Sequence, residues 1–547
     1  MTFTVFCLFA GIGGGALGFQ RAVENLDGRL GRYELLGGVD VDPEVCADFT
    51  ALTGIPATQL DLFSRADYIA FHGHEPPSDW REATPEDLRR AAHGRRPELV
   101  FTSAPCKGLS GLLPGSQAAS PKYQALNRLT VRGIALTLAA WADDPPSLIL
   151  FENVPRITSR GKHLLAEIKS LLTGAGYAFA DQTHDLGEVG GLSQHRRRYL
   201  LVARHRAKLP AVLYRPPGRK VRAIGDALGP LLMPDDPQAG PMHVLPRLSW
   251  LTWVRLALIP AGGDWRDLQD IQPGRYAIEP DRTCYSNIYR CNAWGEPFGA
   301  VTSGKDQAVA DARLDHTPRG GVYRVAMWDE PATTVIGNAR PGGSNGMAAV
   351  ADPRLTDRES RHPSTYKIQS WDEAADTVTG SRFGSGALAM ADPRLHCTPR
   401  SGAYRIQTWS EPSSTVTANG DVHSQGAAAV ADPRIPGNAE RGVWVIKALD
   451  DTWHRPLTTL ELAVLQGFPT RLPDGSPLVL AGKSQARWRE RIGNAVPVQA
   501  AQAIAQAMLV PLMATRMHRF AWSVYSTAVW VRLLSFRRAI GKGGPVP

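Results

Sequence analysis

A cysteine that directly follows a proline, in Pro105-Cys106, is the part of this chain best suited to covalent chemistry. About one strand and one helix further on, the chain reads Glu152-Asn153-Val154. Both motifs stand at the end of an apolar run, and strand ends in an open α/β sheet face a common crevice. A thiol nucleophile and a proton-handling carboxylate placed there are equipped to attack an aromatic ring that resists attack. Alone, each residue is more typical of a buried structural position.

A glycine-rich turn follows the first apolar run and reads Phe9-Ala10-Gly11-Ile12-Gly13-Gly14-Gly15, and the next run ends at Asp40-Val41-Asp42. Glycines let the backbone approach a ligand, the following helix offers free N–H groups, and the acid can bind ribose hydroxyls. The pattern predicts a nucleoside site for S-adenosylmethionine or for a nicotinamide dinucleotide, because Gly13-x-Gly15-x-x-Gly18 fits both. The loop has no lysine, which argues against a nucleoside triphosphate. A turn that binds no ligand is the alternative.

Three consecutive arginines in Ser193-Gln194-His195-Arg196-Arg197-Arg198 precede another strand. Alternation along a strand would send Arg196 and Arg198 to one face and Arg197 to the other. Two convergent guanidinium groups can orient a carboxylate and a carbonyl oxygen together. A solvated basic patch is the alternative.

Short apolar runs alternate with helical patterns from residue 1 to about residue 204, which predicts a mostly parallel sheet with helices on both faces. The near-continuous hydrophobicity of these runs fits burial on both faces. The N-terminal run has no basic start and breaks into glycines at Gly11, so we expect a first strand and not a secretory signal. The expected strands are 4–9, 35–39, 99–102, 147–151 and 199–203.

Composition limits the class of protein. A chain of 547 residues with 43% hydrophobic content is long enough for roughly two to four domains. The net charge of +9 and the pI of about 9.3 favour a polyanionic partner. The six cysteines lack zinc-site spacing, so we expect reduced thiols and no metal. The apolar stretch 521–534 is too short to span a bilayer, so we expect no membrane contact.

In their order along the chain, these motifs resemble those of the DNA (cytosine-5) methyltransferases. The glycine turn resembles the cofactor loop of that family, Pro105-Cys106 its nucleophile motif, and Glu152-Asn153-Val154 its glutamate motif. The arginine run resembles a further motif. The resemblance covers roughly 1–204 and 456–512, where later stretches also match, namely Arg455-Pro456-Leu457-Thr458-Thr459-Leu460-Glu461, Leu465-Gln466-Gly467-Phe468-Pro469 and Gly493-Asn494-Ala495-Val496-Pro497.

The resemblance implies methyl transfer from S-adenosylmethionine to carbon 5 of a flipped cytosine in double-stranded DNA, through a covalent cysteine adduct. It assigns catalysis to Cys106, Glu152, Arg196 and Arg198. Two positions depart from the family, since Lys107 and Leu109 stand where glutamine and phenylalanine are usual. The residues that the resemblance assigns to cofactor binding are Phe9, Gly11, Gly13, Asp40, Asp61, Pro105, Asn494 and Val496.

The implied fold is the α/β, Rossmann-like sheet of class I S-adenosylmethionine-dependent methyltransferases, with a β-rich target-recognition region inserted. We expect the catalytic domain in 1–215, the recognition region in 216–448, a return to the catalytic domain in 449–515 and a basic tail in 516–547. The last helix should return to pack beside the first strand. We expect a cytoplasmic monomer that associates with the nucleoid through DNA, either as an orphan enzyme or beside a separate cognate restriction endonuclease.

Two of the later motifs also predict local structure. Thr458-x-x-Glu461 is a capping box before an apolar helix. Pro497 suits the first turn of a helix. The apolar positions of that helix would include Val498, Ala501, Ala505, Met508 and Leu512.

Between about 289 and 435 the chain repeats itself with a period near forty. Tyr289, Tyr323, Tyr366 and Tyr404 each stand five residues before a tryptophan, and each unit closes with Ala-Asp-Pro-Arg or a near copy. Tyrosine, tryptophan, valine and threonine with Gly/Pro turns favour β units. Their position favours target recognition, and their arginines and aromatics suit contacts with DNA. The alternative is a duplicated framework, since 453–459 echoes the start of a unit, with specificity elsewhere, such as in 215–282.

Three other functions stay open on sequence alone. A tRNA cytosine-5 methyltransferase would share every catalytic residue, although such enzymes resemble compact versions with a short recognition region. A DNA-binding protein with an inactive site is a second, and the intact Cys106, Glu152, Arg196 and Arg198 argue against it. A nicotinamide-dependent dehydrogenase is a third, and it leaves the cysteine and glutamate motifs unexplained.

Overall fold

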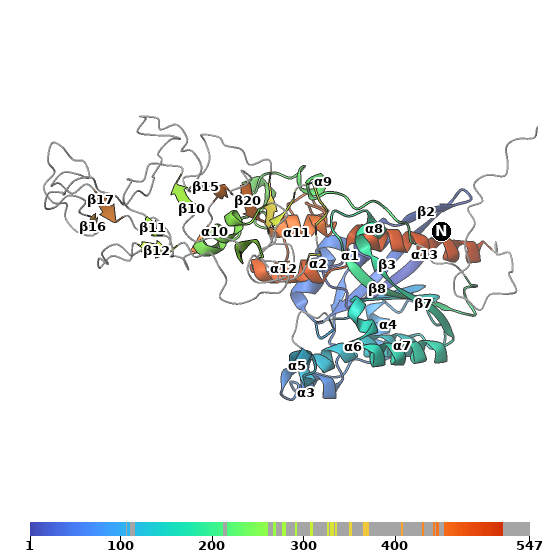
Figure 1. The fold of residues 1–547 in the computed structure, drawn as a ribbon. Helices are drawn as coiled ribbons and strands as arrows, with labels where there is room; N and C mark the ends of the chain where they lie inside the picture. Colours follow the sequence, from blue (N-terminus) through green and yellow to red (C-terminus); the bar gives the residue numbers. More distant parts are fainter. Residues whose placement is uncertain are drawn as a thin grey trace, which may run out of the picture.

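The computed structural model describes residues 1–105, 107–109, 115–211, 216–260, 266–269 and 453–517, and short segments, many of them strands, between 276 and 447. The recognition region is therefore described only in part. The two stretches with the catalytic motifs are described almost throughout, and they form one α/β body (Figure 1).

An eight-stranded sheet forms the centre of this body, in the order β2-β3-β1-β5-β6-β8-β7 with β4 also on β3. Strands β1, β3, β4, β5 and β6 run parallel, whereas β8 is antiparallel to both β6 and β7. This mostly parallel sheet confirms the predicted class I methyltransferase fold. The strands are β1 (Thr2–Leu8), β2 (Val23–Leu26), β3 (Arg29–Asp40), β4 (Ala57–Gln59), β5 (Leu99–Thr102), β6 (Leu148–Asn153), β7 (Tyr177–Asp185) and β8 (Arg197–His205).

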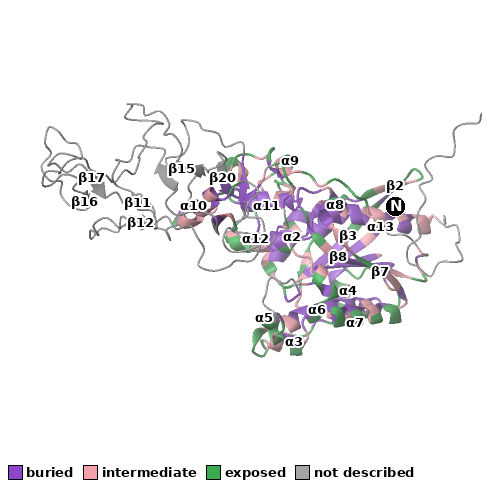
Figure 2. Cartoon of the chain, in the orientation of Figure 1, coloured by how far each residue is buried: buried purple, intermediate pink, exposed green. Residues whose placement is uncertain are grey.

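Helices cover both faces of the sheet (Figures 1 and 2). The side chains of β1 alternate, so that Phe3 and Val5 share a core with α1, α8 and α13, while Phe6 and Leu8 share one with α4 and α6. The helices of the N-terminal part are α1 (Gly14–Arg21), α2 (Pro43–Thr53), α3 (Arg65–His72), α4 (Pro85–Ala91), α5 (Gly115–Ala118), α6 (Pro121–Ala140), α7 (Lys162–Gly174) and α8 (Leu186–Gly190), with the 3-10 helix η1 (Pro155–Thr158).

The chain returns to the sheet at its C-terminal end, as predicted. The side chains of α13 (Val498–Arg516) complete the core around β1, and Arg516 donates a hydrogen bond to the carbonyl oxygen of Thr2. Pro497 is the N-cap of this helix, one residue earlier than the predicted first turn. The stretch Gln485–Arg516 is apolar and long enough to cross a membrane by length and composition, but 72% of its most apolar window is buried inside the protein, as in a core helix.

The capping box predicted at Thr458 is present at the start of α11 (Thr459–Leu465). The Thr458 side chain accepts a hydrogen bond from the backbone N–H of Glu461, and the Glu461 carboxylate accepts one from the N–H of Thr458. The other described helices of this end are α9 (Ile224–Leu228), η2 (Pro237–Ala239), α10 (Trp250–Leu258), η3 (Asp267–Gln269) and α12 (Gln485–Asn494).

The described part of the recognition region is rich in strands, as predicted. Six strands form a second sheet in the order β10-β15-β19-β20-β14-β13, next to α10 and α11 (Figure 1). These are β10 (Tyr276–Pro280), β15 (Thr365–Ser370), β19 (Val445–Lys447), β20 (Trp453–Pro456), β14 (Ala349–Ala351) and β13 (Val325–Ala326). The separate pairs are β11 (Arg290–Asn292) with β12 (Gln307–Val309), β16 (Ile406–Thr408) with β17 (Ala429–Ala431), and β9 (Leu248–Ser249) with β18 (Arg441–Gly442).

All five predicted strands exist, with small differences at their ends. The first strand stops at Leu8 because Phe9 has a left-handed backbone, with φ of 51°. The strands β2, β4 and β7 were not predicted. Their side chains are half-buried or exposed for the most part, so they lack the continuous apolar run that marks a central strand.

Candidate active site

The carboxyl ends of the parallel strands bring the predicted site residues to one edge of the sheet. β5 pairs with β6, so Ser103, just after β5, lies beside Glu152, the fifth residue of β6. The Ser103 hydroxyl donates a hydrogen bond of 2.7 Å to Oε2 of Glu152. Glu152 is only 5% exposed. The side chain that the sequence predicts to handle protons is therefore held at the expected edge.

Cys106 itself lies outside the described residues. The residues on either side, Pro105 and Lys107, are described, and they place the segment three residues beyond Ser103 at the same edge. Lys107 forms an ion pair of 2.5 Å with Glu490 of α12. The described cysteines are poor nucleophiles, because burial raises the pKa of the Cys7 thiol to about 12 and that of Cys46 to about 11.

The two predicted catalytic arginines do not converge, which corrects the sequence prediction. Arg198 forms an ion pair with Glu152, with 3.0 Å between Nε and Oε1. Arg196 is buried elsewhere and donates hydrogen bonds to the carbonyl oxygens of Gly493, Ala495 and Val335. β8 begins at Arg197, so the alternation of a strand does not extend back to Arg196. Arg196 ties the arginine motif to the last motif, and only Arg198 contacts the glutamate.

The glycine turn leaves room for a ligand at the adjacent strand end. Gly11 and Gly13 have positive φ angles of 53° and 87°, a conformation that glycine adopts without strain. A Cβ added to Gly11 would meet nothing within 4 Å. Gly13 is the N-cap of α1, and no side chain among the described residues caps that helix. The first N–H groups of α1 are therefore free to face an anionic or polar ligand.

Asp40 closes the other side of this turn. Its carboxylate accepts hydrogen bonds from the backbone N–H of Gly11, at 3.0 Å, and of Asp42, at 3.3 Å. Burial raises the pKa of the Asp40 carboxyl, and these hydrogen bonds oppose the rise in part. An acid at the end of the second strand of such a sheet is suited to bind ribose hydroxyls.

The remaining predicted cofactor residues surround the same turn. The ring of Phe9 packs so closely over Gly133 that a Cβ there would lie 2.8 Å away from it. The carbonyl oxygen of Val496 would lie 2.2 Å from a Cβ on Gly14, so the last motif touches the glycine turn. Asn494 is exposed. Asp61 accepts hydrogen bonds from the N–H of Phe63 and from the indole N–H of Trp80, at 2.9 and 3.0 Å.

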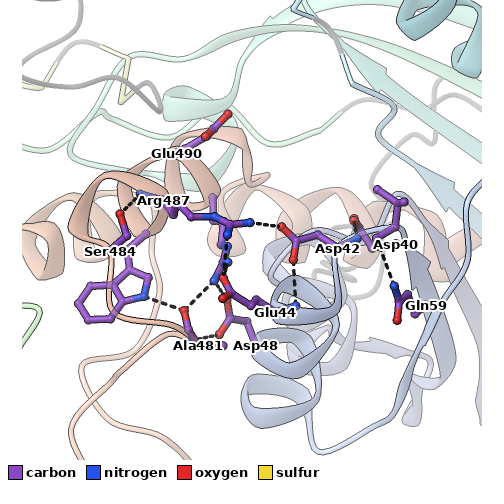
Figure 3. A network of polar contacts seen from close by, with 12 residues as sticks. Asp40, Asp42, Glu44, Asp48, Gln59, Ala481, Ser484, Arg487 and Glu490 are labelled. Carbon is purple, nitrogen blue, oxygen red and sulfur yellow. Dashed lines mark hydrogen bonds and ion pairs between the residues drawn. The ribbon is translucent and has the colours of Figure 1, made fainter. Parts of the chain in front are cut away.

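Helix α12 binds the segment that follows Asp40 through a network of ion pairs (Figure 3). Arg491 pairs with Glu44 and with Asp48 of α2, the latter at 3.0 Å, and is itself only 7% exposed. Arg487 pairs with Asp42 at 3.0 Å. Because Glu490 of the same helix pairs with Lys107, α12 contacts both the cofactor side and the nucleophile side of the edge.

The sequence prediction missed Ser103 and the whole α2–α12 network. A weak signal for the network exists, since Glu44 and Asp48 lie four residues apart on α2, and Arg487 and Arg491 lie four apart on α12. Like charges at this spacing destabilise an isolated helix, so each pair indicates a partner of opposite charge elsewhere. Nothing in the sequence indicates that each helix is the partner of the other.

A family model described as C-5 cytosine-specific DNA methylase matches residues 3–220 and 359–509, which is roughly two thirds of the chain. The chain belongs to this family. The two matched stretches contain every motif on which the predicted resemblance rests. The match also covers the strand ends, the glycine turn and α12 described above.

Two relatives are Type II methyltransferases by name. M.XorII of Xanthomonas oryzae pv. oryzae is 30% identical over 258 residues, which cover 45% of this chain and 49% of the relative. M1.HphI of Haemophilus parahaemolyticus is 24% identical over 276 residues, covering 49% of this chain and 64% of the relative. The chain thus spans about half the length of M.XorII.

Among solved structures, the Entamoeba histolytica methyltransferase EhMeth aligns with a TM-score of 0.45 and 11% identity, over 95% of this chain and 98% of its own. The S. pombe Dnmt2 methyltransferase aligns with a TM-score of 0.42 and 12% identity, over 94% of this chain and 99% of its own.

Proposed function

We propose that this chain methylates carbon 5 of cytosine in double-stranded DNA, with S-adenosylmethionine as the methyl donor. Family membership supports the reaction class. The observation that carries the proposal is the buried Glu152, held by Ser103 and Arg198 at the strand end next to Pro105-Cys106. A carboxylate in this position can engage the ring nitrogen and exocyclic amine of a cytosine whose carbon 6 faces the thiol.

The glycine turn fits S-adenosylmethionine. Open space beside Gly11, the uncapped start of α1 and the Asp40 carboxylate together offer donors and an acceptor to an amino acid and a ribose. Phe9, Gly13, Asp61, Pro105, Asn494 and Val496 complete the proposed binding set. When bound, S-adenosylmethionine supplies an electrophilic methyl group.

The chain's own residues would act on the cytosine in the following order. The base leaves the duplex at a cost of a few kcal/mol, because carbon 6 is out of reach inside the stack. The Cys106 thiolate adds to carbon 6 while Glu152 stabilises the ring by a hydrogen bond at nitrogen 3, and carbon 5 becomes nucleophilic. After methylation, the proton on carbon 5 leaves to a base, the bond between sulfur and carbon 6 breaks, and the thiolate is restored. Arg198 holds the Glu152 carboxylate in place.

We also propose the division of labour between the parts of the chain. The catalytic domain comprises 1–215 and 449–515, the recognition region is 216–448, and the basic tail is 516–547. The names of the Type II relatives favour a modification enzyme that works beside a separate restriction endonuclease. The active form would be a monomer that binds DNA in the cytoplasm.

Bisulfite sequencing of DNA from cells that express the chain tests the reaction, the substrate and the target together. We expect methylation at defined sequences, and none with Cys106→Ser. Trapping on duplex DNA with 5-fluorocytosine tests the adduct, because a fluorine in place of the proton blocks release of the thiolate. Transfer to tRNA but not to duplex DNA would overturn the proposed substrate.

A further inference from the structure

The repeated units of the recognition region share one strand pairing. We number them unit 1 (289–311), unit 2 (323–352), unit 3 (366–392) and unit 4 (404–432), each from its tyrosine to the aspartate of its closing motif. In units 1, 2 and 4, two parallel strands pair in the same register. The residue two after the tyrosine pairs with the residue three before the aspartate, as Cys291 with Ala308, Val325 with Ala349, and Ile406 with Ala429. The units are copies of one structural element.

Unit 2 lies directly against the catalytic domain. Its segment 330–335 runs parallel to the arginine motif, with a β-bridge between Ala332 and Gln194. The N–H of Ala332 donates to Ser193, and the N–H of His195 donates to Ala332, at 2.7 and 2.6 Å. These bonds join main chain to main chain, so they do not depend on which side chains the docked unit carries.

Side chains add a small set of requirements. The hydroxyl of Thr334 donates to the carbonyl oxygen of His195 at 2.8 Å, and Arg196 donates to the carbonyl oxygen of Val335 at 2.8 Å. Ala332 and Val335 are fully buried, in a core with residues of α11 and α12. Asp352 accepts a hydrogen bond of 2.8 Å from the buried Arg455. The seat thus selects a small residue, then Thr-Val, then an aspartate.

Units 3 and 4 carry the same residues in the same order, whereas unit 1 does not. Thr334-Val335 recurs as Thr377-Val378 in unit 3 and as Thr415-Val416 in unit 4, and Asp352 recurs as Asp392 and Asp432. The buried position of Ala332 is occupied by Ala375 in unit 3, Ser413 in unit 4 and Phe298 in unit 1. A phenylalanine does not fit where alanine is fully buried, and Ala300 of unit 1 lacks the threonine hydroxyl.

The family match supplies an independent observation. It leaves out 221–358, which contains the docked unit, and resumes at 359, so that it includes units 3 and 4. The family pattern therefore aligns later units with the place that unit 2 occupies in the structure.

We propose that units 2, 3 and 4 occupy this seat in turn, so that one catalytic domain methylates a different DNA sequence with each unit docked. Units on one chain compete at an effective concentration set by the connecting segments, in the millimolar range for short flexible tethers. Near-equal contacts let several units share the seat. The units differ most between Thr-Val and the closing motif, in 336–348 of unit 2 and 417–428 of unit 4, so the residues presented beside the catalytic domain change with the docked unit. This inference rests on the proposed function.

The test is bisulfite sequencing of DNA methylated by the full chain and by two matched variants. Ala332→Phe places the residue of unit 1 in unit 2, and Ser413→Phe does the same in unit 4. We expect the unaltered chain to methylate more than one sequence, Ala332→Phe to lose one of them, and Ser413→Phe to lose a different one. If Ala332→Phe binds S-adenosylmethionine and melts normally yet methylates no sequence, unit 2 is the sole occupant and the inference is overturned.

A gentler variant keeps the test valid where Ala332→Phe does not fold. Thr334→Ala removes only the hydroxyl that donates to His195, as in unit 1. We expect methylation of one target to fall about three- to tenfold relative to the others. An equal fall at every target, or a single target in the unaltered chain, overturns the exchange. No methylation at all by the unaltered chain overturns the proposed function, which is a separate outcome.

Discussion

The guanidinium of Arg196 lies at the C-terminal end of α12, where it donates hydrogen bonds to the carbonyl oxygens of Gly493 and Ala495, at 3.0 and 3.1 Å. A cation is stabilised at a helix C-terminus, and these carbonyls have no partner within the helix. The same α12 pairs with Lys107 at one point and with α2 at another. One short helix therefore joins the arginine motif, the nucleophile segment and the cofactor segment.

The two arginines of the motif are expected to respond differently to substitution. Arg196→Met leaves buried carbonyls without donors, so we expect the free energy of unfolding to fall by about 3 kcal/mol. Arg198→Lys keeps a positive charge on the edge of the site, so we expect little loss of stability and slower methyl transfer. Urea denaturation and single-turnover rates separate the two effects. Equal losses of stability in both variants would contradict this assignment.

The sequence was sufficient for the main features of the fold because they depend on local patterns. The strand β5 has the predicted bounds, since four apolar residues are followed at once by polar ones. The capping box at Thr458 formed as predicted, because its hydrogen bonds lie within one helical turn. The carboxyl edge of a parallel sheet then brought Ser103 and Glu152 together.

The remaining features depend on contacts between distant segments, which identical or similar residues leave undecided. Arg196 and Arg198 are the same residue type, and only the start of β8 at Arg197 decides which one meets Glu152. Four units share a sequence pattern, so the pattern does not say which of them docks at Gln194. The partner of Arg491 lies 443 positions earlier in the chain, at Asp48.

The charge of Glu152 is expected to be essential for the reaction. Glu152→Gln keeps the shape of the side chain but removes the ability to exchange a proton with the base, so we expect a rate about 10² to 10³ times lower with the fold retained. Ser103→Ala removes one hydrogen bond to the carboxylate and should cost about tenfold or less. Steady-state methylation of duplex DNA measures both. Glu34→Gln, at an exposed ion pair with Arg95, serves as the control and should leave the rate unchanged.

The arginine motif is expected to lose its anchor in acid. Burial alone raises the pKa of Asp185, but hydrogen bonds from Arg196 N–H, His195 and Gly187 N–H outweigh it and hold the pKa below its ordinary value. A depressed pKa in the folded state contributes stability above the unfolded pKa, about 3.9, and the contribution disappears as pH falls through the folded value. Asp185→Asn should therefore be less stable than the unaltered chain at pH 7.

Urea denaturation of both proteins between pH 7 and pH 3 checks this prediction. The difference in unfolding free energy between them should shrink as the pH falls below about 4. A difference that stays constant over this range would show that the charge of Asp185 does not stabilise the folded chain.

The glycines at the first turn are expected to divide into two kinds. A Cβ on Gly18 would lie 2.4 Å from the Cβ of Ala501 and 2.7 Å from the backbone of α13, so Gly18→Ala must push two packed helices apart. We expect the free energy of unfolding to fall by about 1 to 3 kcal/mol. Gly11 has open space around it, and Gly11→Ala meets only the strain of its left-handed backbone, about 1 kcal/mol. Calorimetric binding of S-adenosylmethionine beside urea denaturation distinguishes them. Gly11→Ala should weaken binding more than it lowers stability, because its methyl group projects into the space assigned to the cofactor. Gly18→Ala should show the reverse. Undiminished binding by Gly11→Ala would place the cofactor away from this turn.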